Sequence, residues 1–335
     1  MKILIIKMSS LGDVIHTIPL AKILKERLND VIIDWVVNKE YVDILSNNGI
    51  LRKVIPFNRR EWISVSGFFK TFSEIKRFSK SLKEEQYDVV LDVQGLLKSA
   101  LVTAMAGGKI NVGFDDAREG AVLFYDKKIP VKGVMHAVEK NLLFLDFFNV
   151  KWQRDEVQFP IYVSGEDINS VESLLNNAKV NKDYAVFCPF SRWKTKMWDE
   201  QRFHKLAEMV NDEGIDVVWT GGKNEKLEYK PKHDLTGKLS LNQLYYLFKK
   251  SRFVVTCDSG AMHLASAAGA DIVAIFGPTS PIKTGPYSVK NKTVIIQRDE
   301  LNCVPCFGKT CDRANICLDI TPESVFKNIK EKILL

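Results

Sequence analysis

The sequence lacks a long apolar run, because no stretch of its 335 residues approaches the roughly 18 apolar residues that a membrane-spanning helix requires. The apolar part of Met1–Lys7 is too short for a signal peptide, and no small-residue cleavage site follows it. With only six cysteines, 46% hydrophobic and 27% charged residues, the composition excludes a disulfide-stapled scaffold and a disordered chain. We therefore expect a cytoplasmic protein, and two domains at this length.

Four common catalytic signatures are absent as well. The sequence has no G-x-G-x-x-G after a predicted strand, which would indicate dinucleotide binding, and no phosphate-binding G-x-x-x-x-G-K-[ST]. It also lacks the zinc-binding H-E-x-x-H and the G-x-S-x-G turn of α/β-hydrolases. The sequence therefore gives no motif evidence for a dehydrogenase, a P-loop kinase, a zinc metalloprotease or an α/β-hydrolase.

Short apolar runs alternate with helical patterns in two series along the chain. The expected strands are residues 3–6, 31–37, 89–92, 184–188, 216–219, 253–257 and 272–276. The expected helices are residues 14–27, 200–211, 241–250, 261–268 and a C-terminal helix from 321. This alternation predicts an α/β fold in which helices cover two open parallel sheets.

The less regular stretch 149–165 separates the two series. We expect one domain over residues 1–160, a second over 161–320, and a C-terminal helix, 321–335, that packs back toward the first domain. Ligands of such sheets bind at the carboxyl ends of the strands, so the expected site is a cleft between the domains.

One segment carries the whole net charge of +7. Residues 52–83 contain nine Lys and Arg but only Glu61 and Glu74, and the remaining chain has equal numbers of basic and acidic residues. A positive segment of this kind attracts phosphates, carboxylates or an anionic membrane. The charge alone does not distinguish among these partners.

Two polar segments follow predicted strands and precede predicted helices. Segment 7–13 ends in Asp13, which either caps a helix or acts as a base beside Lys7, while Gly12 permits close approach of a ligand. Segment 258–263, with the sequence DSGAMH, begins a small-residue helix whose exposed amides suit a phosphate group. A capped helix with a core histidine explains the second segment equally well.

Two further segments combine cations, glycines and a carboxylate. Segment 189–198 contains three cations and two tryptophans, and it either neutralises a phosphate leaving group or forms a solvated loop. Segment 220–225, TGGKNE, offers a carboxylate that suits a ribose diol, although a turn also explains its glycines.

The order of these four segments resembles glycosyltransferase family 9, which contains the bacterial lipopolysaccharide heptosyltransferases, over nearly the whole chain. Additional agreement comes from segments 92–99, 116–119, 123–125 and 136–139. Within the family, the resemblance favours the enzymes that add the first heptose, and the alternative is a transferase of the second heptose or a later core sugar. The resemblance implies a GT-B fold and a metal-independent, inverting transfer of L-glycero-D-manno-heptose from ADP-heptose to the inner Kdo of Kdo2-lipid A.

The resemblance also implies roles for individual residues. Asp13 matches the general base, and Lys196 matches the lysine that neutralises the diphosphate. The implied donor-binding residues are Ser191, Arg192, Lys196, Glu225, Leu239, Asp258, Ser259, Gly260 and His263. The implied acceptor-binding residues are Lys7, Ser9, Ser10, Gly12, Arg59, Arg60, Gln94, Arg118 and His136. Arg192 departs from the family, which uses hydroxyl side chains there.

Given such an acceptor, we interpret segment 52–83 as an acceptor and membrane face, because its cations alternate with aromatics as in an interfacial helix. We therefore expect a monomer, peripheral on the cytoplasmic face of the inner membrane, that binds no nucleic acid. The alternative is that the aromatics are core and the charges a solvated face. Rival functions are a nucleotide-sugar epimerase, which needs no lipid acceptor, and a non-catalytic membrane-surface protein, which needs neither Asp13 nor Lys196.

The six cysteines fall into two groups. Cys188 and Cys257 end predicted strands and are expected to be core thiols. The other four are Cys303, Cys306, Cys311 and Cys317. Their spacing lacks the paired C-x-x-C units of a zinc ribbon, so a structural zinc or iron–sulfur site and free thiols remain equally open. No metal or cofactor is expected to take part in catalysis.

Overall fold

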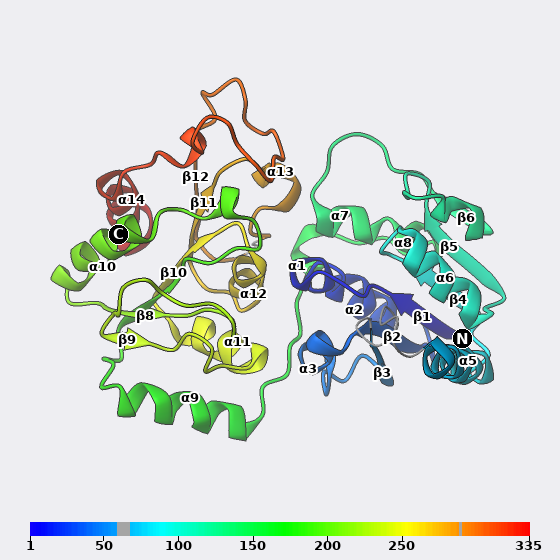
Figure 1. Cartoon of the computed structure of the whole chain (residues 1–335). Coiled ribbons are helices and arrows are strands. Elements are labelled where there is room, and N and C mark those ends of the chain that lie inside the picture. The colour runs from blue at the N-terminus through cyan, green and yellow to red at the C-terminus, as the bar shows by residue number, and fades with distance from the viewer. Residues whose placement is uncertain (59–67, 288–289) are drawn as a thin grey trace. The chain divides into compact units, whose positions relative to one another are not determined.

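The computed structural model describes residues 1–58, 68–287 and 290–335, with the backbone alone over 68–72. The chain divides into two compact units, Met1–Tyr162 and Val163–Leu335. Each unit is a parallel β-sheet with helices packed against it, which confirms the predicted α/β fold class (Figure 1). None of the described helices is long and apolar enough to cross a membrane.

Six described strands form the parallel sheet of the first unit, in the order β3-β2-β1-β4-β5-β6. They are β1 (Lys2–Ile6), β2 (Ile32–Asn38), β3 (Lys53–Phe57), β4 (Val89–Asp92), β5 (Ile110–Phe114) and β6 (Lys127–Ile129). Residues 3–6 of the central strand β1 are fully buried, as expected for a parallel sheet that is covered on both faces. Ile6 pairs with Asp92, so the loops after β1 and β4 begin side by side.

The described helices of the first unit are α1 (Leu11–Ile15), α2 (Ile18–Arg27), α3 (Val42–Leu45), α5 (Phe68–Glu84), α6 (Leu97–Ala106), α7 (Ala137–Leu142) and α8 (Phe144–Phe147). Short 3₁₀ turns are η1 (Lys39–Tyr41), η3 (Ala121–Phe124) and η4 (Arg154–Glu156). The single helix predicted over 14–27 is therefore wrong. The chain breaks at Thr17 because Pro19, which has no N–H to donate, fits the first turn of a new helix.

The sheet of the second unit contains six described parallel strands in the order β12-β11-β10-β7-β8-β9. They are β7 (Tyr184–Cys188), β8 (Asp216–Trp219), β9 (His233–Asp234), β10 (Phe253–Cys257), β11 (Ile272–Phe276) and β12 (Thr293–Gln297). The central strands β7 and β10 are buried along their whole length. Thr256 pairs with Cys188, which places the loops after these two strands next to each other.

The described helices of the second unit are α9 (Gly165–Asn177), α10 (Glu200–Asp212), α11 (Leu241–Lys250), α12 (Gly260–Ala267), α13 (Pro281–Thr284) and α14 (Pro322–Ile329). The unit also contains the 3₁₀ turns η5 (Lys194–Lys196) and η6 (Ile316–Leu318) and the π-helical segment η7 (Lys330–Leu334). The C-terminal helix α14 belongs to the second unit, and its packing toward the first domain stays a prediction. Val325 and Ile329 of α14 are fully buried in the core of the second unit, together with Phe203 and Leu206 of α10.

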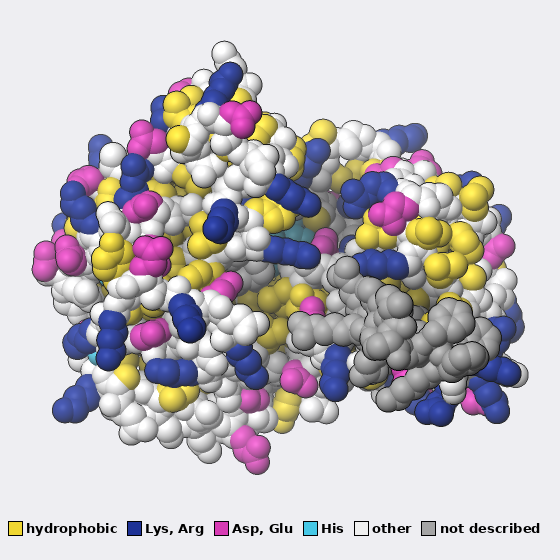
Figure 2. Space-filling model, viewed as in Figure 1, with side chains coloured by type: hydrophobic (Ala, Val, Ile, Leu, Met, Phe, Trp, Pro, Cys, Tyr) yellow, Lys and Arg dark blue, Asp and Glu magenta, His cyan; other side chains and the backbone are white. Residues whose placement is uncertain are grey.

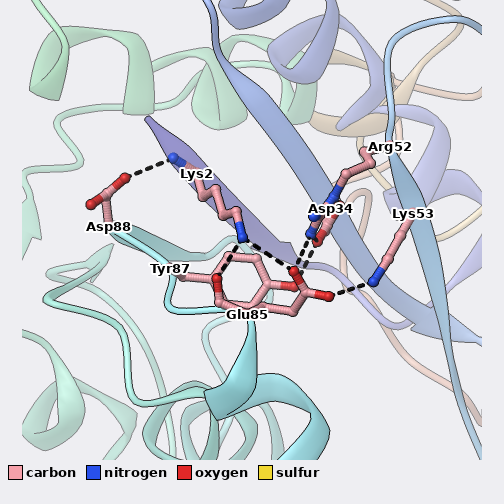
Figure 3. Close-up of polar contacts among 7 residues, drawn as sticks. All are labelled: Lys2, Asp34, Arg52, Lys53, Glu85, Tyr87 and Asp88. Atoms are coloured by element: carbon pink, nitrogen blue, oxygen red, sulfur yellow. Dashed lines mark hydrogen bonds and ion pairs between the residues drawn. The ribbon is translucent and has the colours of Figure 1, made fainter.

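A network of charged side chains surrounds one buried carboxylate near the amino ends of β2, β3 and β4 (Figure 3). Arg52 donates through Nε to Asp34 Oδ1 at 3.0 Å and through a second nitrogen to both Asp34 and Glu85. The Tyr87 hydroxyl donates to Asp34 Oδ2 at 2.7 Å, and Lys53 donates to Glu85. Asp34 is fully buried, so these donors supply the compensation that a carboxylate needs away from water.

This network changes the interpretation of the basic segment 52–83. Arg52 and Lys53 are paired with Asp34 and Glu85, which are outside the segment in sequence but next to it in space. These two cations are therefore neutralised within the fold. The other cations of the segment with described side chains all lie on α5, and they are Lys76, Arg77, Lys80 and Lys83.

Glu85 should make the free energy of unfolding depend on pH in the acidic range. Hydrogen bonds from Lys53 and Arg52 lower the pKa of Glu85 from 4.5 to about 2. Because this pKa is lower in the folded chain, the ionised carboxylate stabilises the fold above about pH 4.5, and the stabilisation is lost as the pH falls toward 2. We expect the loss of unfolding free energy in Glu85→Gln, measured with urea, to be constant above about pH 5 and to shrink toward about pH 3. A loss that stays the same on acidification would contradict this assignment, and Glu84→Gln is the control.

Candidate functional site

In the first unit, the loops after β1 and β4 bring together residues that are far apart in sequence. Lys7 Nζ donates to the carbonyl of Val93 at 3.0 Å. The backbone N–H of Ser9 donates to Gln94 Oε1 at 3.1 Å. Ligands of parallel sheets bind at this end of the strands. The structure therefore places Lys7, Ser9 and Gln94 in one cluster at the edge where the sequence analysis expected the acceptor.

Asp13 lies in the first turn of α1 and joins this cluster. Its Oδ2 accepts hydrogen bonds of 2.8 Å from both the N–H and the hydroxyl of Ser10. Its Oδ1 lies 3.7 Å from Lys7 Nζ. The side chain is 46% exposed, so a substrate can reach it. Asp13 thus has the geometry of a helix cap through one oxygen and presents the other beside a cation.

Lys7 is held in a buried position. Its side chain is only 8% exposed. Trp35, which is fully buried, donates from Nε1 to the Lys7 carbonyl at 3.1 Å and fixes the backbone there. A buried ammonium group requires partners, and the Val93 carbonyl and the Asp13 carboxylate provide them. The cation in turn stabilises the negative charge of Asp13.

A buried carboxylate that the sequence analysis did not single out shapes the neighbouring loop. Asp92 Oδ1 accepts from the N–H groups of Gln94 and Gly95, both at 3.0 Å. Its Oδ2 accepts from Ser99 at 2.9 Å and from Tyr125 at 2.8 Å. Burial raises the pKa of Asp92, while these hydrogen bonds act in the opposite direction. The carboxylate thereby fixes the turn that carries Gln94.

Gly95 is required at that turn. Its φ of +65° lies in the left-handed region, and an added Cβ would approach the Cβ of Ala117 at 3.3 Å. The carbonyl of Gly95 accepts from the N–H of Arg118 at 3.0 Å, which ties the loop of Arg118 to the cluster. The signal in the sequence was an Asp two residues before Gln-Gly, the pattern of a turn closed by an Asp side chain.

The remaining acceptor candidates are described by their own positions in the chain. Arg118 has an exposed side chain. His136 caps α7, its Nδ1 accepts from the N–H of Val138 at 3.2 Å, and its ring lies 5.3 Å from that of His16 at the end of α1. Gly12 lies within α1. Arg59 and Arg60 lie outside the described residues.

In the second unit, the loops after β7 and β10 meet around Asp258. Lys196 Nζ lies 2.7 Å from Asp258 Oδ2, and the Ser191 hydroxyl donates to the Asp258 carbonyl at 2.8 Å. The Asp258 side chain is 4% exposed and that of Lys196 is 18% exposed. Lys196 Nζ also lies 4.6 Å from the centre of the Trp193 ring. Three of the predicted donor residues therefore form one connected group.

Helix α12 begins beside this group. Ser259 is its N-cap and Gly260 its first residue, so the unpaired amides of the first turn start one residue after Asp258. Such amides, together with the helix dipole, favour a phosphate group. His263 lies one turn into the helix and is buried. An ammonium group and a helix N-terminus thus lie at the same end of the sheet.

The other donor candidates are separate from this group among the described contacts. Glu225 turns back on its own loop, where Oε2 accepts from the N–H of Gly222 at 2.6 Å. That geometry agrees with the turn interpretation of segment 220–225. Leu239 is half-buried just before α11, and Arg192 is exposed.

The cysteines do not form a metal site in the described part of the chain. Cys188 and Cys257 are buried, and burial raises the pKa of each thiol to about 12. Cys303 is half-buried, Cys317 is buried, and Cys306 and Cys311 are exposed. Over residues 1–58, 68–287 and 290–335, no group of three or more His, Cys, Asp or Glu is arranged to hold a metal ion. The structure therefore gives no support to the structural metal that the cysteine spacing had left open.

Comparison with known proteins agrees with this arrangement. Residues 75–316 match the sequence profile of glycosyltransferase family 9 (heptosyltransferase). The chain is 32% identical over 321 residues to lipopolysaccharide heptosyltransferase 1 of Pseudomonas aeruginosa, which covers 93% of this chain and 87% of that protein.

Two solved structures share the fold over both units. E. coli heptosyltransferase WaaC with ADP gives a TM-score of 0.77 at 28% identity and covers 99% of each chain. E. coli ADP-heptose lps heptosyltransferase II gives a TM-score of 0.74 at 25% identity and covers 100% of this chain and 99% of that chain. The predicted GT-B fold is therefore confirmed.

Proposed function

Because the chain belongs to glycosyltransferase family 9, the heptosyltransferases, we propose that it transfers L-glycero-D-manno-heptose from ADP-heptose to the inner Kdo of Kdo2-lipid A. The observation that carries the proposal is Asp13, which is held by Ser10, paired with Lys7 and still 46% exposed at the carboxyl end of the first sheet. The donor is supported by the structures of E. coli heptosyltransferase WaaC with ADP and with ADP-2-deoxy-2-fluoro heptose, which are 28% and 27% identical in sequence to this chain.

In the proposed reaction, Asp13 acts as the general base. Its carboxylate accepts the proton of a Kdo hydroxyl as that oxygen bonds to the anomeric carbon of the heptose. The bond between this carbon and the ADP oxygen breaks on the opposite face, with its electron pair on ADP, so the anomeric configuration inverts. The carboxylate also favours the positive charge that develops on the sugar ring in such a transition state.

We assign the departing diphosphate to the second unit. Lys196 and the first amides of α12 supply a positive charge and hydrogen-bond donors at the end of β10. These groups stabilise the charge that grows on the leaving oxygen, the task that a divalent cation performs in other transferases. Metal independence is therefore part of the proposal. Ser191, Asp258, Ser259 and His263 would hold the donor, and we retain Glu225 for the ribose, Leu239 for the adenine, and Arg192 as a donor contact.

The acceptor is assigned to the first unit. Lys7, Arg118 and His136 offer cationic or hydrogen-bonding groups for the carboxylates and hydroxyls of Kdo, and Ser9, Ser10 and Gln94 line the same loops. The alternative product is that of heptosyltransferase II, since a protein of that name also matches over the whole chain.

One assay separates these possibilities. Purified protein is given ADP-heptose with either Kdo2-lipid A or the same lipid already carrying one heptose, each with and without EDTA. We expect transfer to the first acceptor at a rate that EDTA does not change. Transfer to the heptosylated lipid alone would establish the alternative subtype, and loss of activity in EDTA would overturn metal independence. An epimerised sugar nucleotide without transfer would refute the function itself.

We further propose that the first unit binds the anionic surface in which the acceptor is embedded. Leu97 and Leu101 of α6 are 41% and 43% exposed, and Leu123 of η3 is 85% exposed. Helix α6 packs on both η3 and the basic helix α5. In Figure 2, hydrophobic side chains gather near α6, and Lys and Arg side chains are visible along the lower right edge of the first unit. Apolar groups beside cations suit a bilayer interface with anionic headgroups.

A groove between α5 and α6 adds to this surface. Ile75 and Met105 line it together with three cations, one carboxylate and a hydroxyl, which are Lys76, Lys80, Lys83, Glu84 and Ser79. An apolar groove with a basic rim fits acyl chains whose headgroups carry phosphate. Within segment 52–83, the described part of the proposed membrane surface is therefore helix α5. Helix α6 and the turn η3, which lie outside the segment, also belong to this surface.

Reversing the charges of α5 should weaken membrane binding without affecting the donor. In Lys76→Glu/Arg77→Glu/Lys83→Glu, we expect affinity for vesicles containing phosphatidylglycerol, measured by sedimentation, to fall by at least about 100-fold, since the loss of three surface cations at roughly 1 kcal/mol each has that effect before the repulsion of the new carboxylates is added. The control Lys205→Glu/Lys249→Glu changes exposed lysines of the second unit and should leave vesicle binding unaltered. Equal losses of vesicle and ADP affinity in the α5 variant would refute the assignment.

A further inference from the structure

The carboxylate of Asp258, which pairs with Lys196, also accepts a hydrogen bond from Thr279. Thr279 is not among the predicted site residues. The hydroxyl of Thr279 donates to Asp258 Oδ2 at 2.6 Å, the same oxygen that lies 2.7 Å from Lys196 Nζ. Thr279 and Asp258 are both buried. A hydrogen bond from a buried neutral hydroxyl to a carboxylate is strong and directional, so it restricts the rotation of the Asp258 side chain.

Thr279 is itself held by bonds that do not involve a ligand. Gln297, which ends β12, donates from Nε2 to the carbonyls of Gly277 at 3.0 Å and Thr279 at 2.7 Å. The N–H of Phe307 donates to the carbonyl of Pro278 at 2.8 Å. The turn after β11 is therefore fixed from two directions, and the position of the Thr279 hydroxyl is set by the fold.

The same turn lies against the backbone that carries Lys196. A Cβ added to Gly277 would lie 3.0 Å from the carbonyl oxygen of Thr195, so only glycine fits this approach without a shift. The Thr195 hydroxyl donates to the carbonyl of Gly308 at 2.8 Å. The loop of Lys196 and the turn of Thr279 therefore lie against each other, and both are hydrogen-bonded to residues 307–308. The cysteine-containing segment 303–317 thus helps to hold the two loops in place.

We propose that Thr279 is a positioning residue for the diphosphate-binding lysine. By holding Asp258 Oδ2, it fixes the carboxylate that directs the flexible Lys196 side chain, and it does not itself touch the substrate. The inference rests on the proposed function, because Lys196 must bind the diphosphate for its direction to matter. Without the hydroxyl, Asp258 can rotate, and the ammonium group is no longer pre-organised for its anion.

The test compares ADP affinity across a double-mutant cycle, measured by isothermal titration calorimetry. We expect Thr279→Val to weaken ADP binding by about 10-fold, whereas Thr279→Ser, which keeps the hydroxyl, stays within about twofold of the unaltered chain. In the Lys196→Met background, Thr279→Val should change ADP affinity by less than about twofold, because the residue acts through Lys196. Thr103→Val removes another buried hydroxyl, one that donates to the Ser99 carbonyl, and is the control for general packing.

The outcomes are distinguishable. Equal losses from Thr279→Val with and without Lys196 would overturn the inference, because the hydroxyl would then act independently of the lysine. Unchanged ADP affinity in Thr279→Val, or no rescue by serine, would overturn it as well. Failure of the unaltered chain to bind ADP would instead refute the proposed function on which the inference rests. Melting temperatures of all variants separate these results from misfolding.

Discussion

Replacement of Asp13 by asparagine is expected to lower kcat for heptosyl transfer by about 10³-fold, within the range that a general base contributes. Asparagine retains an oxygen that accepts from the Ser10 N–H, but it cannot take a proton at neutral pH. The donor is assigned to the second unit, so ADP affinity should stay within about twofold. The measurement is the single-turnover rate with saturating ADP-heptose and Kdo2-lipid A, together with ADP affinity by calorimetry.

The chain contains a matched control for this variant. Ser164 and Asp167 at the start of α9 repeat the Ser10–Asp13 arrangement: the Ser164 hydroxyl donates to Asp167 Oδ2 at 2.7 Å, and its N–H donates to the same oxygen at 3.3 Å. Asp167→Asn therefore perturbs the same kind of helix cap without a proposed base. We expect it to leave kcat unchanged. Comparable losses in both variants would show that Asp13 is only a cap.

Replacement of Lys196 by methionine is expected to lower kcat/KM for ADP-heptose by about 10²- to 10³-fold, the usual cost of removing one group that stabilises a developing anion. Methionine preserves much of the apolar stem but removes the charge that faces Asp258 and the Trp193 ring. Steady-state kinetics with varied donor provides the measurement. Because Asp258 is buried, the melting temperature must be recorded as well, since an unpaired carboxylate there destabilises the fold.

Lys194 provides the control for Lys196. Both residues lie in η5, but Lys194 is exposed and lines a separate pocket near Trp198 and Glu200. Lys194→Met removes a cation two residues away and should change kcat/KM by less than about twofold. If both variants lose activity equally, the effect comes from the net charge of the loop, and the specific role of Lys196 is refuted.

The sequence predicted the buried centre of each sheet far better than its edges. Strands β1, β2, β4, β7, β8, β10 and β11 were expected because most of their residues are apolar. The edge strands β3, β6, β9 and β12 were not predicted, nor was β5, which lies next to an edge. Strand β3 contains Lys53 and Pro56, and β9 has only two residues, so neither produces the apolar pattern on which such predictions depend.

Candidate site residues could be proposed from the sequence where a polar motif follows a strand, as for Asp13, Lys196 and Asp258. Residues whose contacts are long-range could not be proposed in this way. Asp92 and Thr279 were overlooked because their partners, Tyr125 and Asp258, are distant in sequence and no local pattern connects them. The net charge counted for segment 52–83 was misleading for the same reason. Asp34 lies outside this segment in sequence, but the pairing of β2 with β3 brings it to Arg52, whose charge it neutralises.

The two carboxylate oxygens of Asp13 have different neighbours. Oδ2 accepts from Ser10 and holds the start of α1, whereas Oδ1 faces Lys7. In the proposed reaction, a proton received on Oδ1 leaves both bonds from Ser10 in place. The helix therefore keeps its cap through every catalytic cycle, and resetting the base requires only release of a proton to solvent, with no rearrangement of the loop.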